Sequence, residues 1–216
     1  MISTADVVSE IIRNQPLLED GLSRGIISYS ALARDIRPQI EEKLMKKVTR
    51  GAIVMAVKRV SKNLKNRVKK TDQEINLTGI TVRSDLVELT YANSETIAGN
   101  FKHVFSIAEK HNETMCNLSQ GIRETMFIVG KDIVLDIEKL FRNERYVAKV
   151  ENLSSITILL AKNTINIPGV YYSILKLFAW NDISVIDIIS TFSELTIIFN
   201  NKDIDTAFSL LKNYKK

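Results

Sequence analysis

The residues of this chain best placed to do chemistry are a proline and a glycine that precede an apolar helical pattern. Pro168 falls at the expected first turn of a helix, where its missing N–H group has no intrahelical partner to lose. Gly169 follows it and, because it has no side chain, lets another backbone or a small ligand come close to the helix start. This turn is therefore the first place where we expect a ligand.

The sequence contains no recognisable catalytic arrangement. It has neither a Gly-rich phosphate loop nor a Gly-x-Ser-x-Gly motif, and no nucleophile is paired with a base. Cys116 is the single cysteine and is expected to be a small buried hydrophobe. With only His103 and His111 beside it, no Cys/His cluster suited to zinc is present. We therefore expect a protein that is not an enzyme, with no catalytic residues, no metal and no cofactor.

The positive charge of the chain is concentrated in its first third. The formal net charge is +5, but residues 1–72 carry +7 and residues 73–216 carry −2. Residues 43–70 contain 11 Lys or Arg and no acidic residue. They make a concentrated positive surface if they share a face. The candidate DNA-binding residues are Arg50, Lys58, Arg59, Lys62 and Lys65.

These basic residues belong to a segment, residues 1–70, that is predicted to be helical. Its arrangement is similar to winged-helix proteins, with residues 28–36 as the supporting helix and residues 49–65 as the recognition helix. The intervening stretch is longer than the turn of a simple helix-turn-helix motif, and no wing hairpin is evident. The alternative is a solvated helix face on a segment that dimerises or covers a sheet. Apolar periodicity predicts the preceding helices at 4–14, 17–23, 28–36 and 39–46.

The remainder of the chain is an internal repeat. The polar segment 66–73 has no apolar period and is predicted to be a linker, so residues 71–82 are assigned to a linker and a strand. Two copies follow, residues 83–150 and 151–216, which share one order of elements. The predicted strands are 75–82, 86–91, 114–119, 124–129, 146–150 and 155–161, with two more inside 163–199; the predicted helices are 97–110, 132–141, one after Pro168, and 203–214.

The second copy resembles the ACT domain, a small amino-acid-sensing module, and especially the regulatory ACT pair of aspartokinases. The resemblance rests on IPGVYYSILKLFAWNDISVIDI, on the STFSEL that follows and on a two-strand finish. It implies an α+β fold of two ferredoxin-like βαββαβ (ACT) domains preceded by an all-α helical domain. The first copy has residues 93–99 where the second has Pro-Gly, which leaves its ligand binding open.

The resemblance also implies a ligand site. In ACT pairs a small amino acid sits between the loop and helix start of one copy and the second strand of its neighbour, and helix N-terminal N–H groups suit its carboxylate. Asp187 could then meet the α-ammonium group. The alternative is that the strand residues only fill the core or face solvent. Transferred position by position, the ligand-binding residues are Asn166, Ile167, Pro168, Gly169 and Val170 in the loop, and Ser184, Val185, Ile186 and Asp187 in the strand.

The second copy lacks a fourth strand after its last helix, which leaves one edge of its sheet short. We hypothesise that residues 75–78, which precede the first copy, complete the sheet of the second.

These expectations favour an allosteric, amino-acid-sensing transcription regulator with a small amino acid and DNA as partners. A homodimer is expected because open ACT sheets tend to pair. No apolar run reaches the ~20 residues of a membrane helix and the N-terminus does not resemble a signal peptide, so we expect no membrane and a cytoplasmic protein. One alternative is a stand-alone regulatory subunit that docks on an amino-acid-biosynthetic enzyme such as an aspartokinase. Another is a structural module that has lost its ligand.

Overall fold

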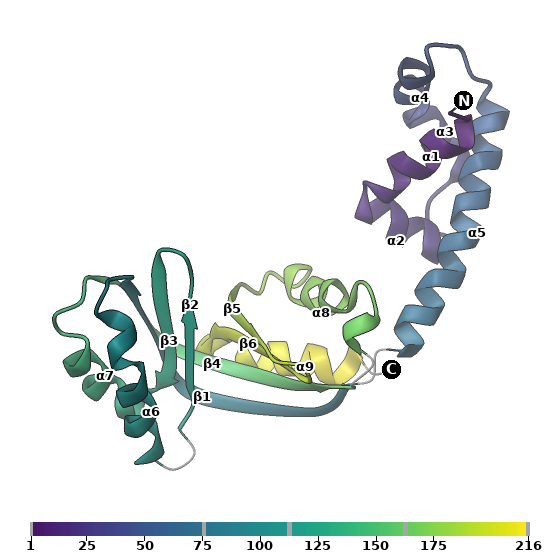
Figure 1. The fold of residues 1–216 in the computed structure, drawn as a ribbon. Coiled ribbons are helices and arrows are strands. Elements are labelled where there is room, and N and C mark those ends of the chain that lie inside the picture. The colour runs from purple at the N-terminus through teal and green to yellow at the C-terminus, as the bar shows by residue number, and fades with distance from the viewer. Residues whose placement is uncertain (1, 75–76, 112–113, 162–163, 215–216) are drawn as a thin grey trace. The chain divides into compact units, whose positions relative to one another are not determined.

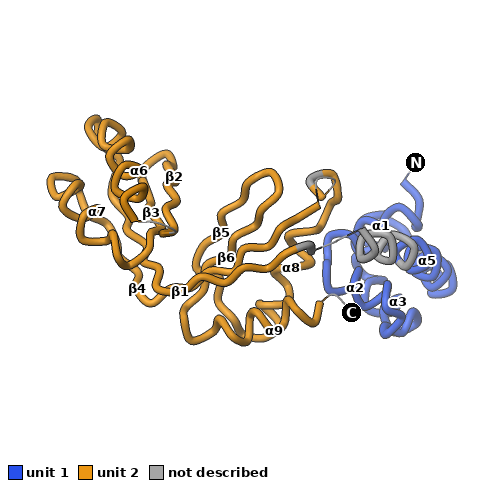
Figure 2. The backbone as a smooth tube through the Cα atoms, turned by 90° about the horizontal axis from the view of Figure 1, so that it is seen from below, with its two compact units in different colours: residues 1–75 blue, residues 76–216 orange. Residues whose placement is uncertain are grey.

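A computed structural model describes residues 2–74, 77–111, 114–161 and 164–214, with the side chains of residues 65–78 and of Ile165 left outside the description. The chain divides into two compact units, Met1–Ile75 and Asn76–Lys216 (Figure 2). Among the described residues, no helix combines the length and the apolar character that crossing a membrane requires.

The first unit is built only from helices in its described part, and its long last helix runs beside three of the others (Figure 1). Val8, Ile12, Leu22, Ile53 and Val57 are fully buried in a shared apolar core. Apolar residues recur here at helical spacing, so each helix buries one stripe and leaves its charged residues outside. The helices are α1 (Thr4–Arg13), α2 (Pro16–Arg24), α3 (Tyr29–Asp35), α4 (Arg37–Leu44) and α5 (Arg50–Glu74).

The ends of these helices follow from local chemistry. Ser3 accepts a hydrogen bond from the Asp6 backbone and forms a capping box with the Asp6 side chain. Gly25 ends α2 with a φ of 75°, a conformation that glycine adopts without strain. The predicted linker at 66–73 is wrong, because α5 continues through it. Its Lys, Arg, Asn and Gln residues have no apolar period, yet none of them breaks a helix as Gly or Pro would.

The second unit contains one antiparallel sheet of six described strands in the order β2-β3-β1-β4-β6-β5 (Figure 1). Two helices accompany each half of the sheet. The strands are β1 (Leu77–Ala92), β2 (Cys116–Gln120), β3 (Glu124–Gly130), β4 (Tyr146–Leu160), β5 (Val185–Ser190) and β6 (Glu194–Asn200). The helices are α6 (Phe101–Glu109), α7 (Val134–Leu140), α8 (Val170–Ala179) and α9 (Ile204–Tyr214), and the short 3₁₀ helices are η1 (Ile97–Asn100), η2 (Lys131–Ile133), η3 (Thr164–Asn166) and η4 (Asn201–Asp203).

Each half of the sheet has its own aromatic core beneath the helices. In the first half Tyr91, Phe127 and Phe141 are buried together, with the rings of Phe127 and Phe141 4.8 Å apart between centroids. In the second half Phe178 of α8 meets Phe199 of β6 at 4.9 Å. Ring pairs at such distances stabilise the fold beyond the area that they bury. Successive strand residues face opposite sides, so the alternate residues of β1 point to the sheet face without helices.

β1 and β4 are each longer than predicted. The expected strands at 75–82 and 86–91 are one strand, and those at 146–150 and 155–161 are also one strand. Midway along them, Asp85 has a φ of 58° and Asn152 a φ of 57°, and the register between the two strands shifts around them. The boundaries expected at 82/83 and 150/151 therefore fall inside continuous strands, just before these irregular residues.

β1 and β4 each contribute to both halves of the sheet. Residues 86–92 of β1 pair with β3, whereas the first part of β1 pairs with the last part of β4, placing Leu77 opposite Leu160 and Val82 opposite Ile156. This pairing agrees with the hypothesis for residues 75–78 at Leu77, which lies opposite Leu160; Thr78 falls in a register shift, and Ile75 and Asn76 lie outside the described residues. In the first half the order is β4, β1, β3, β2, and in the second half it is β1, β4, β6, β5. The two halves therefore have corresponding strand orders.

Candidate functional site

A cavity of about 360 Å³ opens at the N-terminus of α8, in the second half of the sheet unit. It is formed where the end of β4, the helix η3, the first turn of α8 and the β5–β6 turn come together. Its size lies within the range of small-molecule sites. The described residues that line it are Leu160, Thr164, Ile167, Gly169, Val170, Tyr171, Tyr172, Thr191 and Phe192.

The first turn of α8 presents free backbone donors to this cavity. Gly169 precedes the helix with a φ of 86°, a left-handed conformation that residues with a Cβ adopt at a cost, and no side chain caps the helix. The first backbone bond of the helix runs from the Ser173 N–H to the Gly169 carbonyl. The N–H groups of Val170, Tyr171 and Tyr172 therefore have no intrahelical partner. They form a site that suits an anion such as a carboxylate.

Thr164 adds a buried polar group to the same wall. Its side chain is only 5% exposed, and its Oγ1 has no hydrogen-bond partner among the described residues. Its backbone N–H donates to the Ala161 carbonyl at 2.8 Å, which holds the residue in place. Buried polar groups are nearly always paired, so this hydroxyl could bond to a water or to a molecule bound in the cavity.

Most of the rest of the described wall is apolar, and the hydroxyl of Tyr171 is already hydrogen-bonded. The hydroxyl of Tyr171 pairs with Oγ of Ser190 at 2.7 Å. Phe192, which is 62% exposed, stands in the β5–β6 turn at the rim. Leu160, Ile167 and Val170 supply aliphatic surface.

The structure brings part of the predicted loop to the cavity. Ile167, Gly169 and Val170 line it, whereas Asn166 and Pro168 lie in the same loop without being among the lining residues.

The predicted strand residues lie elsewhere in this unit. Ser184 is exposed just before β5, and Val185, Ile186 and Asp187 follow on that strand, none of them among the cavity lining. Asp187 accepts a hydrogen bond from the Ile188 N–H through Oδ1 at 2.7 Å, and its Oδ2 is buried without a partner. Ile186 packs against an apolar cluster around Ile198.

Several lining residues were missed by sequence reasoning. Tyr171 and Tyr172 directly follow the Gly-Val pair, and helix geometry alone places them in the first turn. Phe192 belongs to the STFSEL segment, which supported the family resemblance but was not predicted to line a ligand site. Thr164 had no sequence signal, because its burial depends on how η3 packs. The missed residues are Leu160, Thr164, Tyr171, Tyr172, Thr191 and Phe192.

The corresponding loop of the first half binds a carboxylate of the chain itself. Ser94 Oγ donates to Glu144 Oε2 at 2.6 Å, and Thr96 Oγ1 donates to Glu144 Oε1 at 2.7 Å. Ser94 Oγ in turn accepts from the backbone N–H groups of Thr96 and Ile97. The loop that enters η1 and α6 is thus already paired with an internal anion.

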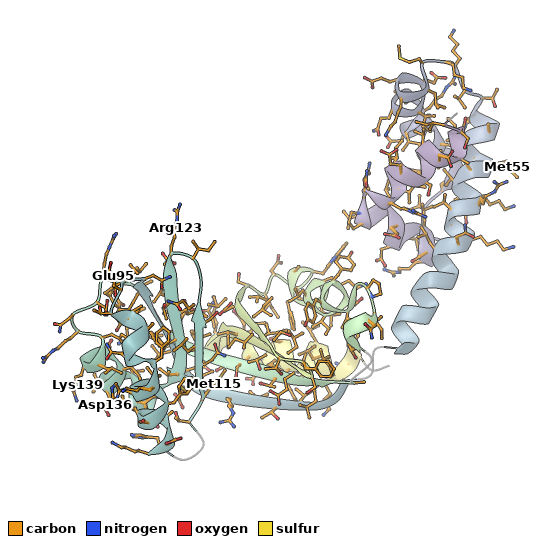
Figure 3. All side chains as sticks on the ribbon, in the orientation of Figure 1. Met55, Glu95, Met115, Arg123, Asp136 and Lys139 are labelled. Atoms are coloured by element: carbon orange, nitrogen blue, oxygen red, sulfur yellow. The ribbon has the colours of Figure 1, made fainter. Side chains whose placement is uncertain are left out.

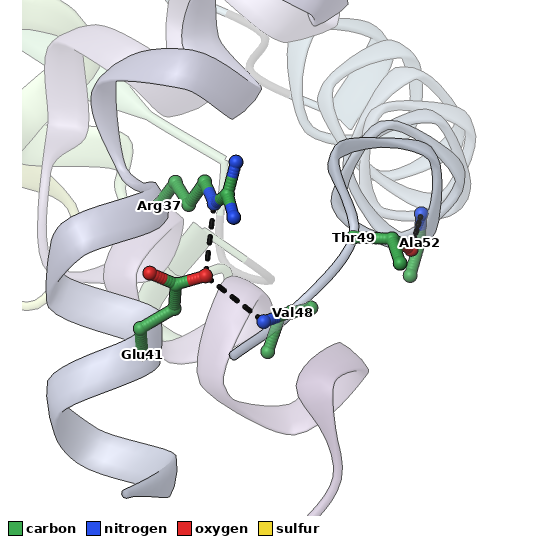
Figure 4. Close-up of polar contacts among 5 residues, drawn as sticks. All are labelled: Arg37, Glu41, Val48, Thr49 and Ala52. Carbon is green, nitrogen blue, oxygen red and sulfur yellow. Dashed lines mark hydrogen bonds and ion pairs between the residues drawn. The ribbon is translucent and has the colours of Figure 1, made fainter. Parts of the chain in front are cut away.

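In the helical unit, polar contacts fix the start of the basic helix (Figure 4). Glu41 Oε1 accepts from Arg37 Nε and from the Val48 backbone N–H, both at 2.9 Å. The Val48 hydrogen bond, followed by that of Arg37, holds the pKa of this carboxyl below its ordinary range. Thr49 Oγ1 accepts from the Ala52 N–H at 3.3 Å and caps α5 as expected.

Three of the predicted DNA-binding residues are exposed on α5. Lys58, Arg59 and Lys62 have no ion-pair partner in the described part of the chain. Arg50 instead donates to the Ser30 carbonyl at 3.2 Å, and the Lys65 side chain lies outside the described residues. Figure 3 shows Met55, which is 65% exposed, on the outer side of the same helix.

No protein-family model and no curated protein sequence matches the chain. Among solved structures, it is similar to the ligand-free regulatory subunit of aspartate kinase from Thermus thermophilus, with 14% identity, a TM-score of 0.52, and coverage of 65% of this chain and 99% of that one. It is also similar to the aspartate kinases of Clostridium acetobutylicum (12% identity, TM-score 0.55) and Synechocystis (16%, 0.53), again over 65% of this chain.

The chain spans 35% of the Clostridium kinase and 27% of the Synechocystis kinase, but nearly all of the Thermus regulatory subunit. The structural neighbours are thus aspartokinase regulatory ACT domains, as the sequence resemblance predicted. At these identities the likeness shows a shared fold.

Proposed function

We propose that the chain is a non-catalytic regulatory protein that binds a small amino acid at the N-terminus of α8. The observation that carries this proposal is the cavity in which the N–H groups of the first turn of α8 and the unpaired hydroxyl of Thr164 share one wall. The carboxylate of the amino acid accepts from those donors, its side chain fills the apolar part of the cavity, and its α-ammonium group stays outside that apolar part. The fold shared with an aspartate kinase regulatory subunit supports a regulatory role.

We further propose that the sheet unit is a pair of ferredoxin-like ACT domains that exchange a strand. The repeated strand order and the helix pair on each half support this assignment. One ligand per chain is expected, because Glu144 already pairs with the loop of the first half. β5 ends the described sheet, so in a homodimer the residues 184–187 of one protomer are available to meet the ligand of its partner.

A thermal-shift screen of the twenty amino acids tests the proposed function. A ligand that binds only the native state at 100 times its Kd stabilises that state by about 2.7 kcal/mol, so at least one amino acid should raise the Tm by several degrees. Thr191→Trp, at an exposed position of the wall, should fill the cavity and abolish this shift. Ile122→Trp changes the equivalent turn of the first half and should retain it. A flat response to all twenty amino acids would sink the proposal.

DNA binding through α5 is a second candidate function, favoured by Lys58, Arg59 and Lys62, which are exposed and have no ion-pair partner among the described residues. Contacts to phosphates release counterions, so DNA affinity should fall steeply as the salt concentration rises. The logarithm of the binding constant should fall with the logarithm of the salt concentration with a slope near −0.9 for each phosphate neutralised. Arg59→Glu should weaken binding in a gel shift at two salt concentrations. Lys102→Glu, which makes the same charge change on α6, should not. Equal affinity at both salt concentrations would contradict DNA binding.

Docking on an amino-acid-biosynthetic enzyme such as an aspartokinase is the alternative use of the helical unit. It predicts that the chain co-purifies with such an enzyme and that the gel shift is absent.

A further inference from the structure

We infer that the amino acid bound at α8 has an uncharged side chain, with aliphatic and aromatic ones favoured over amides. This inference rests on the proposed function, since it concerns the ligand of the same cavity. Once the carboxylate has bound the backbone donors of the first turn of α8, the remaining residues of the wall determine which side chain is favoured.

The described wall offers apolar surface and no charge. Leu160, Ile167, Val170 and Phe192 present hydrocarbon, and none of the described lining residues is acidic or basic. The hydroxyl of Tyr171 is already bonded to Ser190. An aliphatic or aromatic ligand side chain would therefore gain from burial, whereas an amide would leave polar groups unpaired.

A cationic ligand side chain fares worst in this arrangement. The wall has no described carboxylate to pair with it, and an ion removed from water without a partner loses far more than it gains. Lys176 Nζ already lies over the ring of Tyr172, 5.5 Å from its centroid, so a second cation would meet a like charge beside the wall. Lys176 is not among the lining residues itself, and Lys162 lies outside the described residues.

Thr164 gives the described cavity wall a buried side-chain hydroxyl without a hydrogen-bond partner. Its hydroxyl is buried and has no partner among the described residues, so a ligand oxygen that reaches it would supply the missing hydrogen bond. Thr164→Val keeps the shape and removes the hydroxyl. It should weaken the best ligand about tenfold, the size expected for one hydrogen bond to a charged group, without lowering the Tm of the unliganded protein.

Isothermal titration of the full chain with leucine, phenylalanine, glutamine, lysine and glutamate tests the inference. Leucine or phenylalanine should bind most tightly, glutamine more weakly, and lysine and glutamate at least about a hundredfold more weakly. Thr81→Val, the same change at an exposed position of β1, is the matched control for Thr164→Val and should leave affinity unchanged.

The two proposals fail in different ways. If lysine, glutamate or glutamine binds most tightly, amino-acid sensing stands and the inferred side-chain class is wrong. If Thr164→Val binds the best ligand as tightly as the wild type, the assigned role of Thr164 is wrong. If no amino acid among the twenty binds, the proposed function itself fails and the inference falls with it.

Discussion

Glu88 is a half-buried carboxylate on the helix-free face of the sheet, opposite Ile128 and Val150. Burial raises its pKa above the ordinary value of 4.5, and the negative charge of Asp187 raises it further, against a smaller lowering by the hydrogen bond from Thr90. Asp187 has a buried oxygen without a partner close by on the same face. Burial and the nearby charge of Asp187 together make ionisation of Glu88 costly to the fold.

Glu88→Gln should therefore become more stabilising as the pH rises. A carboxyl whose folded pKa is raised contributes no penalty below its ordinary pKa of 4.5, and the wild type loses stability as the pH climbs through the folded pKa. The variant avoids that loss. Denaturation at pH 4 and pH 7 should show a larger gain at pH 7. In Asp187→Asn the same pH dependence should shrink but persist, because burial is the larger cause; a pH-independent gain for Glu88→Gln would contradict this account.

Gly169→Ala and Gly51→Ala should change stability in opposite directions. An added Cβ meets no atom within 4 Å at either site, so the two substitutions differ only in the backbone conformation at the glycine. Gly169 has a φ of 86°, where alanine costs roughly 1–2 kcal/mol. Gly51 lies within α5, where alanine is favoured by up to about 1 kcal/mol. Urea denaturation measures both. Equal effects would indicate that the left-handed turn before α8 is not required for folding.

At the scale of elements, the defining feature is that β1 and β4 pass through both halves of the sheet. Their irregular midpoints at Asp85 and Asn152 are what sequence reasoning took for breaks between strands, since Asp and Asn are typical turn residues. Only the pairing of distant strands shows that the chain continues across them. The exchanged strand was predictable, because counting strands left the second copy one short.

The site was less predictable than the fold. Pro168 was expected in the first turn of α8, but the helix begins at Val170 with Gly169 as its N-cap, so Pro168 lies just outside it. The helix start that this pair marks in sequence does border the cavity. Thr164 and Phe192 reach the wall through the packing of η3 and the β5–β6 turn, which local sequence does not determine. The closure of the first loop by Glu144 likewise joins residues from opposite ends of one copy. Local preferences thus locate a binding turn, whereas tertiary contacts decide which side chains complete it.

The midpoint of β4 can be tested at a single position. Asn152→Val should destabilise the fold by roughly 1–2 kcal/mol, because a β-branched residue tolerates a φ of 57° poorly. Asn152→Gly, at the same position, should be neutral or slightly stabilising. Thermal denaturation of the two variants measures the difference. If valine is tolerated as well as glycine, the strand can straighten at this point and the exchange of strands does not depend on the bend.

At the scale of the whole molecule, the chain joins a basic helical unit to a sheet unit with a ligand cavity. Regulation requires that a ligand of one unit has unequal affinity for two states of the molecule, since a ligand that binds both states equally shifts nothing. The helical unit has exposed cations, which suit a polyanion, and the sheet unit has free backbone donors, which suit a single carboxylate, so the two units are expected to bind different ligands. Any effect of one ligand on the other must therefore pass through the protein.

That coupling can be measured from both sides. If the amino acid changes DNA affinity by some factor, DNA must change amino-acid affinity by the same factor, and allosteric factors commonly lie between about 5 and 150. Gel shifts with and without the amino acid, and titrations of the amino acid with and without DNA, should give equal factors within this range. Thr191→Trp should remove the first effect while leaving the DNA affinity of the unliganded protein unchanged. If both ligands bind and neither changes the affinity for the other, the two units act independently and the amino acid does not regulate DNA binding.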